Sequence, residues 1–234
     1  MAFAWFALSN AKKVTVLVLY CFVSSFVAFF VMSEPPEVIY KVLVVGPPAV
    51  GKTCLIRRYV HGVFTSATPT TVMVDFSMKV VPQPSRTVNL RLWDIQGQEQ
   101  PGYLGRTYYG GAVGAVVVCD ASKADTLKEA VSWKKDIETK VFLPGTSDEP
   151  VPCFLCCNKC DLTTPPKEDM DRFCDANGFV GWLPTSGMKD INVCAAFNSL
   201  ISAIDRSMPV QERKEEESPA PFPRRPKKDS RCKC

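Results

Sequence analysis

Histidine is almost absent from this sequence, and its scarcity excludes metal sites that need two or more histidine ligands. His61 is the single histidine among 234 residues. Cys153 and Cys156 have the CxxC spacing of a zinc site, but no second such pair follows, and a closed zinc site needs four ligands. Several of the 11 cysteines lie in apolar, strand-like runs, where cysteine behaves as a small buried hydrophobe. We therefore expect reduced thiols in a cytosolic protein.

The body of the chain also carries almost no net charge. Residues 223–234 hold six basic side chains and one acidic side chain, whereas the whole chain has a formal charge of +4. Residues 1–222 therefore sum to about −1. Because attraction to polyanions follows charge, we expect no nucleic-acid partner and only the tail to approach an anionic surface.

An apolar run long enough to span a bilayer occurs once, at Val14–Met32. It contains 19 uncharged residues and is preceded by Lys12 and Lys13. As a helix it would be about 28 Å long, close to the hydrocarbon thickness of a bilayer, about 30 Å. Residues 1–33 are therefore an apolar N-terminal extension that, taken alone, predicts a membrane span or a signal peptide.

Residues 38–208 alternate between short apolar runs and stretches with helical periodicity. Strands are expected at Lys41–Val45, Val74–Val81, Val88–Ile95, Ala112–Cys119, Val151–Cys157 and Gly181–Pro184, and helices at Gly51–Val60, Thr126–Thr139, Glu168–Asn177 and Ile191–Ser207. This alternation predicts an α/β fold with a mostly parallel sheet covered by helices on both faces. Such sheets bind ligands at the carboxyl ends of their strands.

The segment Gly46–Thr53 (GPPAVGKT) matches GxxxxGK[ST] between an expected strand and an expected helix. In that context the motif forms a loop whose backbone N–H groups and helix N-terminus hold phosphate oxygens. Lys52 is expected to reach the β- and γ-phosphates, and the Thr53 hydroxyl to ligate Mg²⁺. The alternative is a chance glycine turn followed by Lys-Thr.

A second motif, Asn158-Lys159-Cys160-Asp161, follows an expected strand on the same edge of the sheet. A carboxylate there can accept hydrogen bonds from N1–H and the exocyclic amine of guanine, a donor pair that adenine lacks. Asp161 is thus the expected guanine selector, with Asn158 bracing the phosphate loop and the Lys159 stem covering the base. By itself the motif could be a polar turn, but its position after the phosphate loop makes the signal strong.

A third motif, Trp93–Glu99 (WDIQGQE), follows the expected strand Val88–Ile95. Asp94 is placed to hold Mg²⁺ through water, Gly97 to offer its N–H to the γ-phosphate, and Gln98 to orient an attacking water. A solvated polar loop would not require this combination of residues.

These three motifs resemble the Ras superfamily and, within it, the Rab family, over about residues 40–208. The resemblance implies a P-loop NTPase G domain with a six-stranded, mostly parallel sheet, and GTP or GDP with Mg²⁺ as cofactors. Phe64 matches the aromatic residue that packs edge-on to guanine, and Thr71 the threonine that ligates Mg²⁺ in the GTP state. Ser186 and Gly187 match the last guanine-contacting loop. The residues implied to hold the phosphates are Ala49, Val50, Gly51, Lys52, Thr53 and Cys54.

Phe76, Trp93 and Tyr108 match the Rab positions that form a hydrophobic surface for effectors, although core packing is an equal alternative for these aromatics. Other segments are most similar to the Rab branch that serves melanosomes and other lysosome-related organelles. These segments are RYVH at Arg58–His61, MDRFC at Met170–Cys174 and FVGW at Phe179–Trp182.

The implied function is a GDP/GTP switch in vesicle or organelle trafficking that hydrolyses GTP slowly and binds effectors in the GTP state. The implied partners are an exchange factor, a GTPase-activating protein, effectors, a prenylation escort and a GDP-dissociation inhibitor. The implied location is the cytosolic face of a lysosome-related organelle, melanosome, or endosomal or trans-Golgi vesicle, with cycling through the cytosol.

The phosphate loop departs from the family at Pro47, Pro48 and Ala49, which replace polar or glycine residues, and Gln96 replaces a usual alanine. Proline donates no N–H. The phosphate-holding amides are expected from Ala49 onward, so binding should survive. Pro48 is expected beside the catalytic water, which leaves a GTP-binding module with impaired hydrolysis as an alternative.

The C-terminal segment 209–234 is rich in charge and proline and predicts a disordered tether, because it lacks the apolar area that would offset ordering. It ends in Cys232-Lys233-Cys234, which resembles the C-x-C signal for double geranylgeranylation. Two lipid chains anchor a protein stably where one does not, and the adjacent basic run would favour an anionic membrane.

The N-terminal run conflicts with this anchor. Lysines before residues 14–32 and glutamates after them would, by the positive-inside rule, send the nucleotide-binding domain across the membrane. Met32 begins a stretch of 203 residues, a natural size for the family. We therefore expect residues 1–31 to be an upstream extension absent from the working protein. A membrane-spanning GTPase-like protein anchored by residues 14–32 is the alternative.

Overall fold

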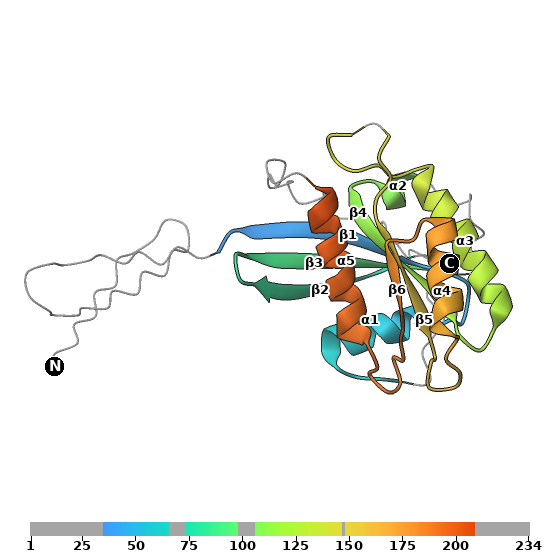
Figure 1. Cartoon of the computed structure of the whole chain (residues 1–234). Coiled ribbons are helices and arrows are strands. Elements are labelled where there is room, and N and C mark those ends of the chain that lie inside the picture. The colour runs from blue at the N-terminus through green and yellow to red at the C-terminus, as the bar shows by residue number, and fades with distance from the viewer. Residues whose placement is uncertain (1–34, 66–73, 98–105, 147, 209–234) are drawn as a thin grey trace, which may run out of the picture.

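The computed structural model describes residues 35–65, 74–97, 106–146 and 148–208, which are drawn in colour in Figure 1. Several predicted features lie outside these ranges, namely Thr71, Gln98, Cys232, Cys234, the apolar extension at 1–33 and the tail at 209–234. Among the helices of the described ranges, none has the length and apolarity that crossing a bilayer requires.

Strands and helices alternate along the described chain and build one sheet. The strands are β1 (Glu37–Val45), β2 (Val74–Gln83), β3 (Arg86–Ile95), β4 (Ala112–Asp120), β5 (Cys153–Asn158) and β6 (Gly181–Pro184). The helices are α1 (Lys52–His61), α2 (Arg106–Tyr109), α3 (Ala124–Glu138), α4 (Lys167–Asn177) and α5 (Val193–Ser207).

The sheet has the strand order β2-β3-β1-β4-β5-β6. β2 pairs antiparallel with β3, and every other neighbouring pair is parallel. The predicted six-stranded, mostly parallel sheet is therefore confirmed. Because parallel strands end at the same edge, the loops after β1, β4, β5 and β6 are brought together.

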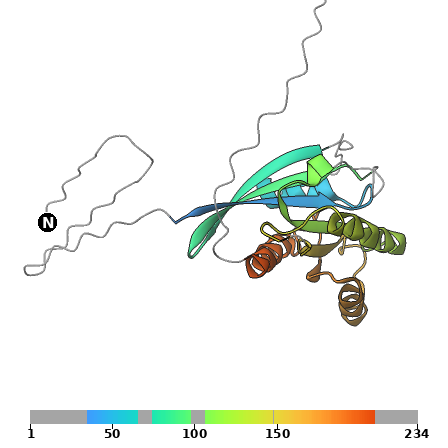
Figure 2. The same cartoon turned by 90° about the horizontal axis from the view of Figure 1, so that it is seen from above.

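The middle of the sheet is buried on both faces. All nine residues of β4 are buried, and successive side chains of a strand point to opposite faces. Gly114 lets α5 approach β4 closely, since a Cβ at this position would lie 2.8 Å from Cδ1 of Ile204. Tyr59 of α1 stacks on Phe197 of α5 with ring centroids 4.0 Å apart. In Figure 2 the orange-red ribbon of α5 lies alongside the sheet.

β1 is longer than predicted, because it begins at Glu37 rather than at Lys41. Its first residues pair with β3, starting with Glu37 opposite Thr87. The side chains from Glu37 to Tyr40 alternate between exposed and buried positions, which is the pattern of a half-buried strand. The prediction followed the apolar run after Lys41, and the sequence itself does not alternate here, because Ile39 is apolar although it is exposed. The strand itself therefore begins one residue before position 38.

The short helix α2 was not predicted, because four residues carry no measurable periodicity. Its last residue, Tyr109, is fully buried. The Tyr109 hydroxyl donates to Oδ2 of Asp136 on α3, 2.7 Å away. Tertiary contacts with α3 therefore hold this segment.

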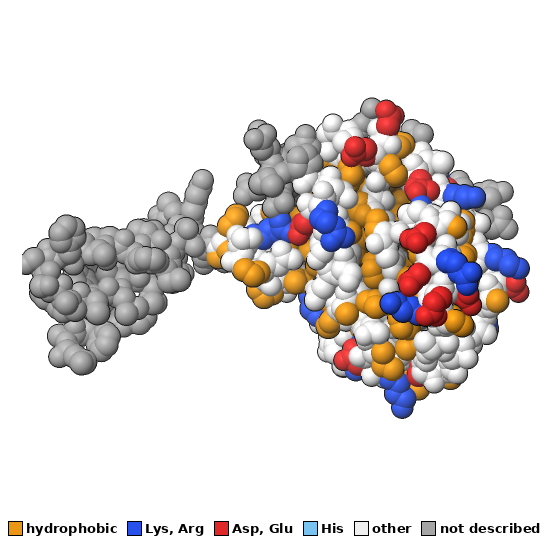
Figure 3. Space-filling view, in the orientation of Figure 1, with side chains coloured by type: hydrophobic (Ala, Val, Ile, Leu, Met, Phe, Trp, Pro, Cys, Tyr) orange, Lys and Arg blue, Asp and Glu red, His pale blue; other side chains and the backbone are white. Residues whose placement is uncertain are grey.

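The strand cysteines behave as predicted. Cys119, Cys153, Cys156 and Cys157 are all buried within β4 and β5. Burial raises the pKa of the Cys153 thiol to about 12, so this thiol stays protonated at neutral pH. The surface of the domain is mixed in charge, and Figure 3 shows acidic and basic side chains interspersed over the face in view.

Candidate functional site

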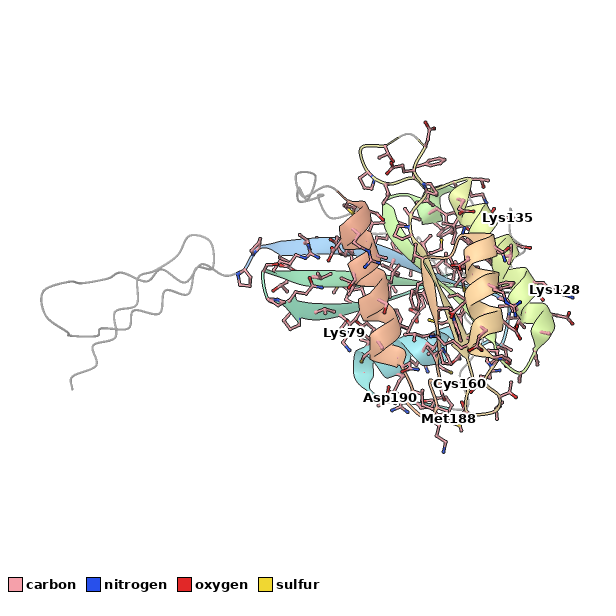
Figure 4. All side chains as sticks on the ribbon, in the orientation of Figure 1. Lys79, Lys128, Lys135, Cys160, Met188 and Asp190 are labelled. Carbon is pink, nitrogen blue, oxygen red and sulfur yellow. The ribbon has the colours of Figure 1, made fainter. Side chains whose placement is uncertain are left out.

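The three sequence motifs meet at one edge of the sheet. The loop of residues 46–51 follows β1, residues 96–97 follow β3, residues 159–161 follow β5, and residues 185–187 follow β6. In Figure 4 the labelled Cys160 and Met188, which belong to the loops after β5 and β6, lie at the same end of the molecule. The predicted nucleotide-site residues of these four loops therefore share one region.

The loop of residues 46–51 depends on glycine at two positions. Gly46 has a φ of 140°, and a Cβ there would lie 2.2 Å from the carbonyl oxygen of Val118. Gly51 has a φ of 96°, and its Cβ would lie 2.4 Å from Nδ2 of Asn158. Positive φ values strain residues that have a side chain. This backbone path therefore requires glycine at both positions.

Lys52 spans the loop that precedes it. Its ammonium group is buried and donates to the carbonyl oxygens of Gly46 and Pro47, each 2.8 Å away. Burial lowers the pKa of Lys52 to about 8, although the nearby Asp94 carboxylate acts in the opposite direction. Pro47 thus takes part through its carbonyl oxygen, and this hydrogen bond does not require the N–H that proline lacks.

Gly97 lies directly against this lysine. A Cβ at Gly97 would lie 2.5 Å from Nζ of Lys52 and 2.7 Å from the carbonyl oxygen of Pro47. The backbone of the third motif therefore approaches the loop at the point where Lys52 ends. A concave backbone lined by a buried ammonium group suits an anion such as a phosphate group.

Thr53 and Asp94 form an oxygen pair beside the loop. The Thr53 hydroxyl donates to Oδ2 of Asp94 at 2.5 Å. Hydroxyl, carboxylate and phosphate oxygens are the ligands that Mg²⁺ prefers, and it commonly uses one or two carboxylates together with substrate phosphates. The donor set at this position therefore fits Mg²⁺.

Asn158 links the loop to the far side of the site. Its Nδ2 donates to the carbonyl oxygen of Val50 at 2.8 Å. Its Oδ1 accepts a hydrogen bond from the N–H of Gly187 at 3.2 Å. One buried side chain thus fixes the distance between the loop after β1 and the loop after β6.

Asp161 lies next to Ser186, and the Ser186 hydroxyl donates to Oδ1 of the carboxylate at 2.5 Å. Ser186 is fully buried, and its Oγ also accepts from the N–H of Lys189 at 3.0 Å. The loop after β6 therefore supports Asp161 in a fixed orientation.

Asp120, at the end of β4, is a site residue that the sequence analysis missed. It receives the ammonium group of Lys159 at 2.6 Å, and Lys159 also donates to the carbonyl oxygen of Ala49 at 2.8 Å. Burial would raise the pKa of Asp120, but hydrogen bonds from Lys159 and Ser122 outweigh it and lower the pKa below its usual value. The sequence contained this information, because Asp120 comes directly after the expected strand Ala112–Cys119 just as Asn158 comes directly after Val151–Cys157.

The aromatic residues of the predicted effector surface are partly exposed. Phe76 and Trp93 are opposite one another on β2 and β3 and form an edge-to-face pair with centroids 6.0 Å apart. Phe76 is 47% exposed, whereas Trp93 and Tyr108 pack partly against the core. Lys41 lies 3.9 Å from the Trp93 ring centroid and donates to the carbonyl oxygen of Gly110 at 2.6 Å. Phe64, after α1, is half-buried.

Comparison with known proteins agrees with this architecture. Residues 41–206 match the model of the Ras family. Human Ras-related protein Rab-32 is 43% identical over 186 residues, covering 76% of this chain and 82% of that protein. Rab-32A of Dictyostelium discoideum is 41% identical over 173 residues, with 72% and 78% covered. Human Rab-7L1 is 41% identical over 172 residues, with 72% and 84% covered. The chain therefore belongs to the Ras family and, within it, to the Rab small GTPases, which hydrolyse GTP and act as switches in membrane trafficking.

Proposed function

We propose that this site binds a guanine nucleotide with its phosphates in the loop Gly46–Thr53 and its base against Asp161 and the loop Ser186–Gly187. The observation that carries the proposal is the position of Asn158, which bonds to Val50 of one loop and Gly187 of the other. A ligand that bridges these loops needs an anionic end and a polar ring end, as a nucleotide has. Phe64 would cover the base from the α1 side.

The phosphate end would be held by backbone N–H groups and by Lys52. Residues 49–54 lead into and begin α1, and the N–H groups and dipole of a helix N-terminus favour an anion. Thr53, Asp94 and Thr71 would hold Mg²⁺, which when bound neutralises charge that develops on the phosphates. The Gly97 N–H would donate a hydrogen bond to the γ-phosphate, and Thr71 would ligate Mg²⁺ only when GTP is bound. The segments around Thr71 and Gly97 would therefore be held in place in the GTP state and released after hydrolysis.

Hydrolysis is proposed to depend on Gln98 orienting the attacking water. Replacing Gln98 by leucine is expected to slow single-turnover GTP hydrolysis by at least about tenfold, because leucine cannot position a water molecule. The affinity for GDP should not change. Gln100→Leu serves as the matched control and should hydrolyse GTP at the rate of the unchanged protein. If Gln98→Leu had no effect on an already slow rate, the chain would be a GTP-binding module with impaired hydrolysis.

Membrane attachment is proposed to come from prenylation of Cys232 and Cys234. Replacing both cysteines by serine is expected to move the protein from the membrane to the soluble fraction of cells, because two lipid chains supply stable anchoring. Cys194→Ser, at an exposed cysteine on α5, is the control and should leave the distribution unchanged. Retention of the doubly substituted protein in carbonate-washed membranes would contradict the proposal and favour a span at residues 14–32.

The finer cellular role follows from the same assignments. We propose that Phe76, Trp93 and Tyr108 present a hydrophobic surface to effectors in the GTP state. The family also implies four further partners, which we propose for this chain: an exchange factor, a GTPase-activating protein, a prenylation escort and a GDP-dissociation inhibitor. The similarity to Rab-32 and Rab-7L1 supports a role in trafficking at an intracellular membrane. The site of action that we propose is the cytosolic face of a lysosome-related organelle such as a melanosome, or of an endosomal or trans-Golgi vesicle.

A further inference from the structure

Arg58, in the last turn of α1, joins two segments that are far apart in the sequence. Its Nε donates to the carbonyl oxygen of Gly187 at 2.9 Å. Its two terminal nitrogens donate to the carbonyl oxygens of Gly62 at 2.6 Å and Met188 at 3.2 Å. The three acceptors are backbone atoms, so their positions are set by the path of the chain.

One of these acceptors, Gly62, lies directly after the last residue of α1. Gly62 caps the helix with a φ of 69°, and its N–H bonds back to the carbonyl oxygen of Arg58. Arg58 and Gly62 therefore hold one another through both main chain and side chain. The chain continues directly to Val63 and Phe64, so the position of Gly62 determines where the segment after α1 begins.

The other two acceptors lie in the loop proposed to contact guanine. The Gly187 residue is held from two sides, since its N–H donates to Asn158 and its carbonyl oxygen accepts from Arg58. A Cβ at Gly187 would lie 3.4 Å from the backbone of Cys54 and Leu55, so this loop packs directly on α1. Ser186, which supports Asp161, is the preceding residue.

We propose that Arg58 is a positioning residue for the bound nucleotide, which fixes the loop Gly187–Met188 against the C-terminal end of α1. A displacement of Gly62 would then loosen the loop under the base as well as the segment after α1. Movement of Gly62 would thereby speed nucleotide release without any change in the phosphate loop. The inference rests on the proposed function, because it takes the loop after β6 to be the guanine-contacting loop.

A purely structural role for Arg58 makes a different prediction. A cation near a helix C-terminus is stabilising, and a lysine would supply that charge almost as well. Only arginine presents a planar fork whose donors can reach several fixed carbonyl groups at once. The two roles are therefore separated by the lysine variant and by the dependence of stability on nucleotide.

The test is the rate at which fluorescent GDP leaves the magnesium-loaded full chain for Arg58→Ala, Arg58→Lys and the control Arg172→Ala. Arg172 is an exposed arginine on α4 that pairs with Asp169. We expect release to be at least about tenfold faster for Arg58→Ala, since charge-assisted hydrogen bonds are lost, and still several-fold faster for Arg58→Lys. The control should match the unchanged protein.

Thermal melting at low and high GDP concentrations gives the second readout. A ligand stabilises the folded state in proportion to the logarithm of its concentration over Kd. The melting temperature of Arg58→Ala should therefore gain less from a fixed low concentration of GDP than that of the unchanged protein. Equal gains and unchanged release rates, or full rescue by Arg58→Lys, would overturn the inference. If the unchanged protein failed to bind GDP, the proposed function itself would be wrong.

Discussion

Replacing Asp161 by asparagine is expected to lower the affinity for GDP by about 10⁴-fold. An effect of this size is typical when a hydrogen-bonding group of the ligand and its partner in the site are no longer complementary. The carboxylate can accept from both N1–H and the exocyclic amine of guanine. Asparagine presents an NH₂ group in place of one acceptor oxygen, and this group would face a donor on the base. Ser186 donates to Oδ1 of Asp161 at 2.5 Å, which orients the other oxygen for the ligand.

The same substitution should create a new preference. Xanthine carries a carbonyl group where guanine carries its exocyclic amine, so the asparagine NH₂ can donate to it. Xanthosine diphosphate should therefore bind Asp161→Asn more tightly than GDP does. Titration of both nucleotides against the variant measures this, with Asp125→Asn on the exposed surface of α3 as the control. Equal GDP affinity in the variant and the unchanged protein would show that Asp161 does not contact the base.

Lys52→Met is the second substitution with a large expected effect. Lys52 would supply charge-assisted hydrogen bonds to phosphate oxygens, and the loss of one or two of these bonds lowers affinity by about 10²- to 10⁴-fold. Methionine has a similar length and is apolar, so it can occupy the buried position of this side chain. The affinity for GDP, measured by titration with a fluorescent analogue, should fall while circular dichroism shows an intact fold.

The matched control for this substitution is Lys128→Met. Lys128 is 82% exposed on α3 and pairs with Asp125. Lys128→Met therefore removes the same charge as Lys52→Met, but at a position away from the site. Its GDP affinity should equal that of the unchanged protein. If Lys52→Met bound GDP within a factor of about three of the control, the loop after β1 would not be the phosphate site, since even a neutral hydrogen bond contributes more when its partner is buried.

The parts of the fold that the sequence predicted are those with a strong local signal. β4 is an unbroken apolar run, and the glycines of the loop 46–51 are required by backbone paths that a Cβ would block. The start of β1 and the helix α2 were missed. Pairing with β3 extends β1, and Tyr109 holds α2 through Asp136 on α3. Neither contact can be predicted from the periodicity of the neighbouring sequence.

The same distinction holds within the site. Motif residues such as Lys52, Asn158 and Asp161 were identified because their spacing after strands is informative. Arg58 was not assigned a role, since its acceptors are backbone carbonyls up to 130 positions away and any residue type could supply them. Asp120 falls between these cases, because its position at the end of β4 indicated the site edge but its partner Lys159 is known only from the fold.

The central claim is that the loops joined by Asn158 bind the two ends of one guanine nucleotide. The most direct measurement is the nucleotide content of the purified full chain, together with displacement of bound fluorescent GDP by unlabelled GDP, GTP and ATP. About one guanine nucleotide per chain is predicted, displaced by GDP and GTP but not by ATP at the same concentration. Equal displacement by ATP, or a chain that retains no nucleotide in the presence of Mg²⁺, would contradict the claim.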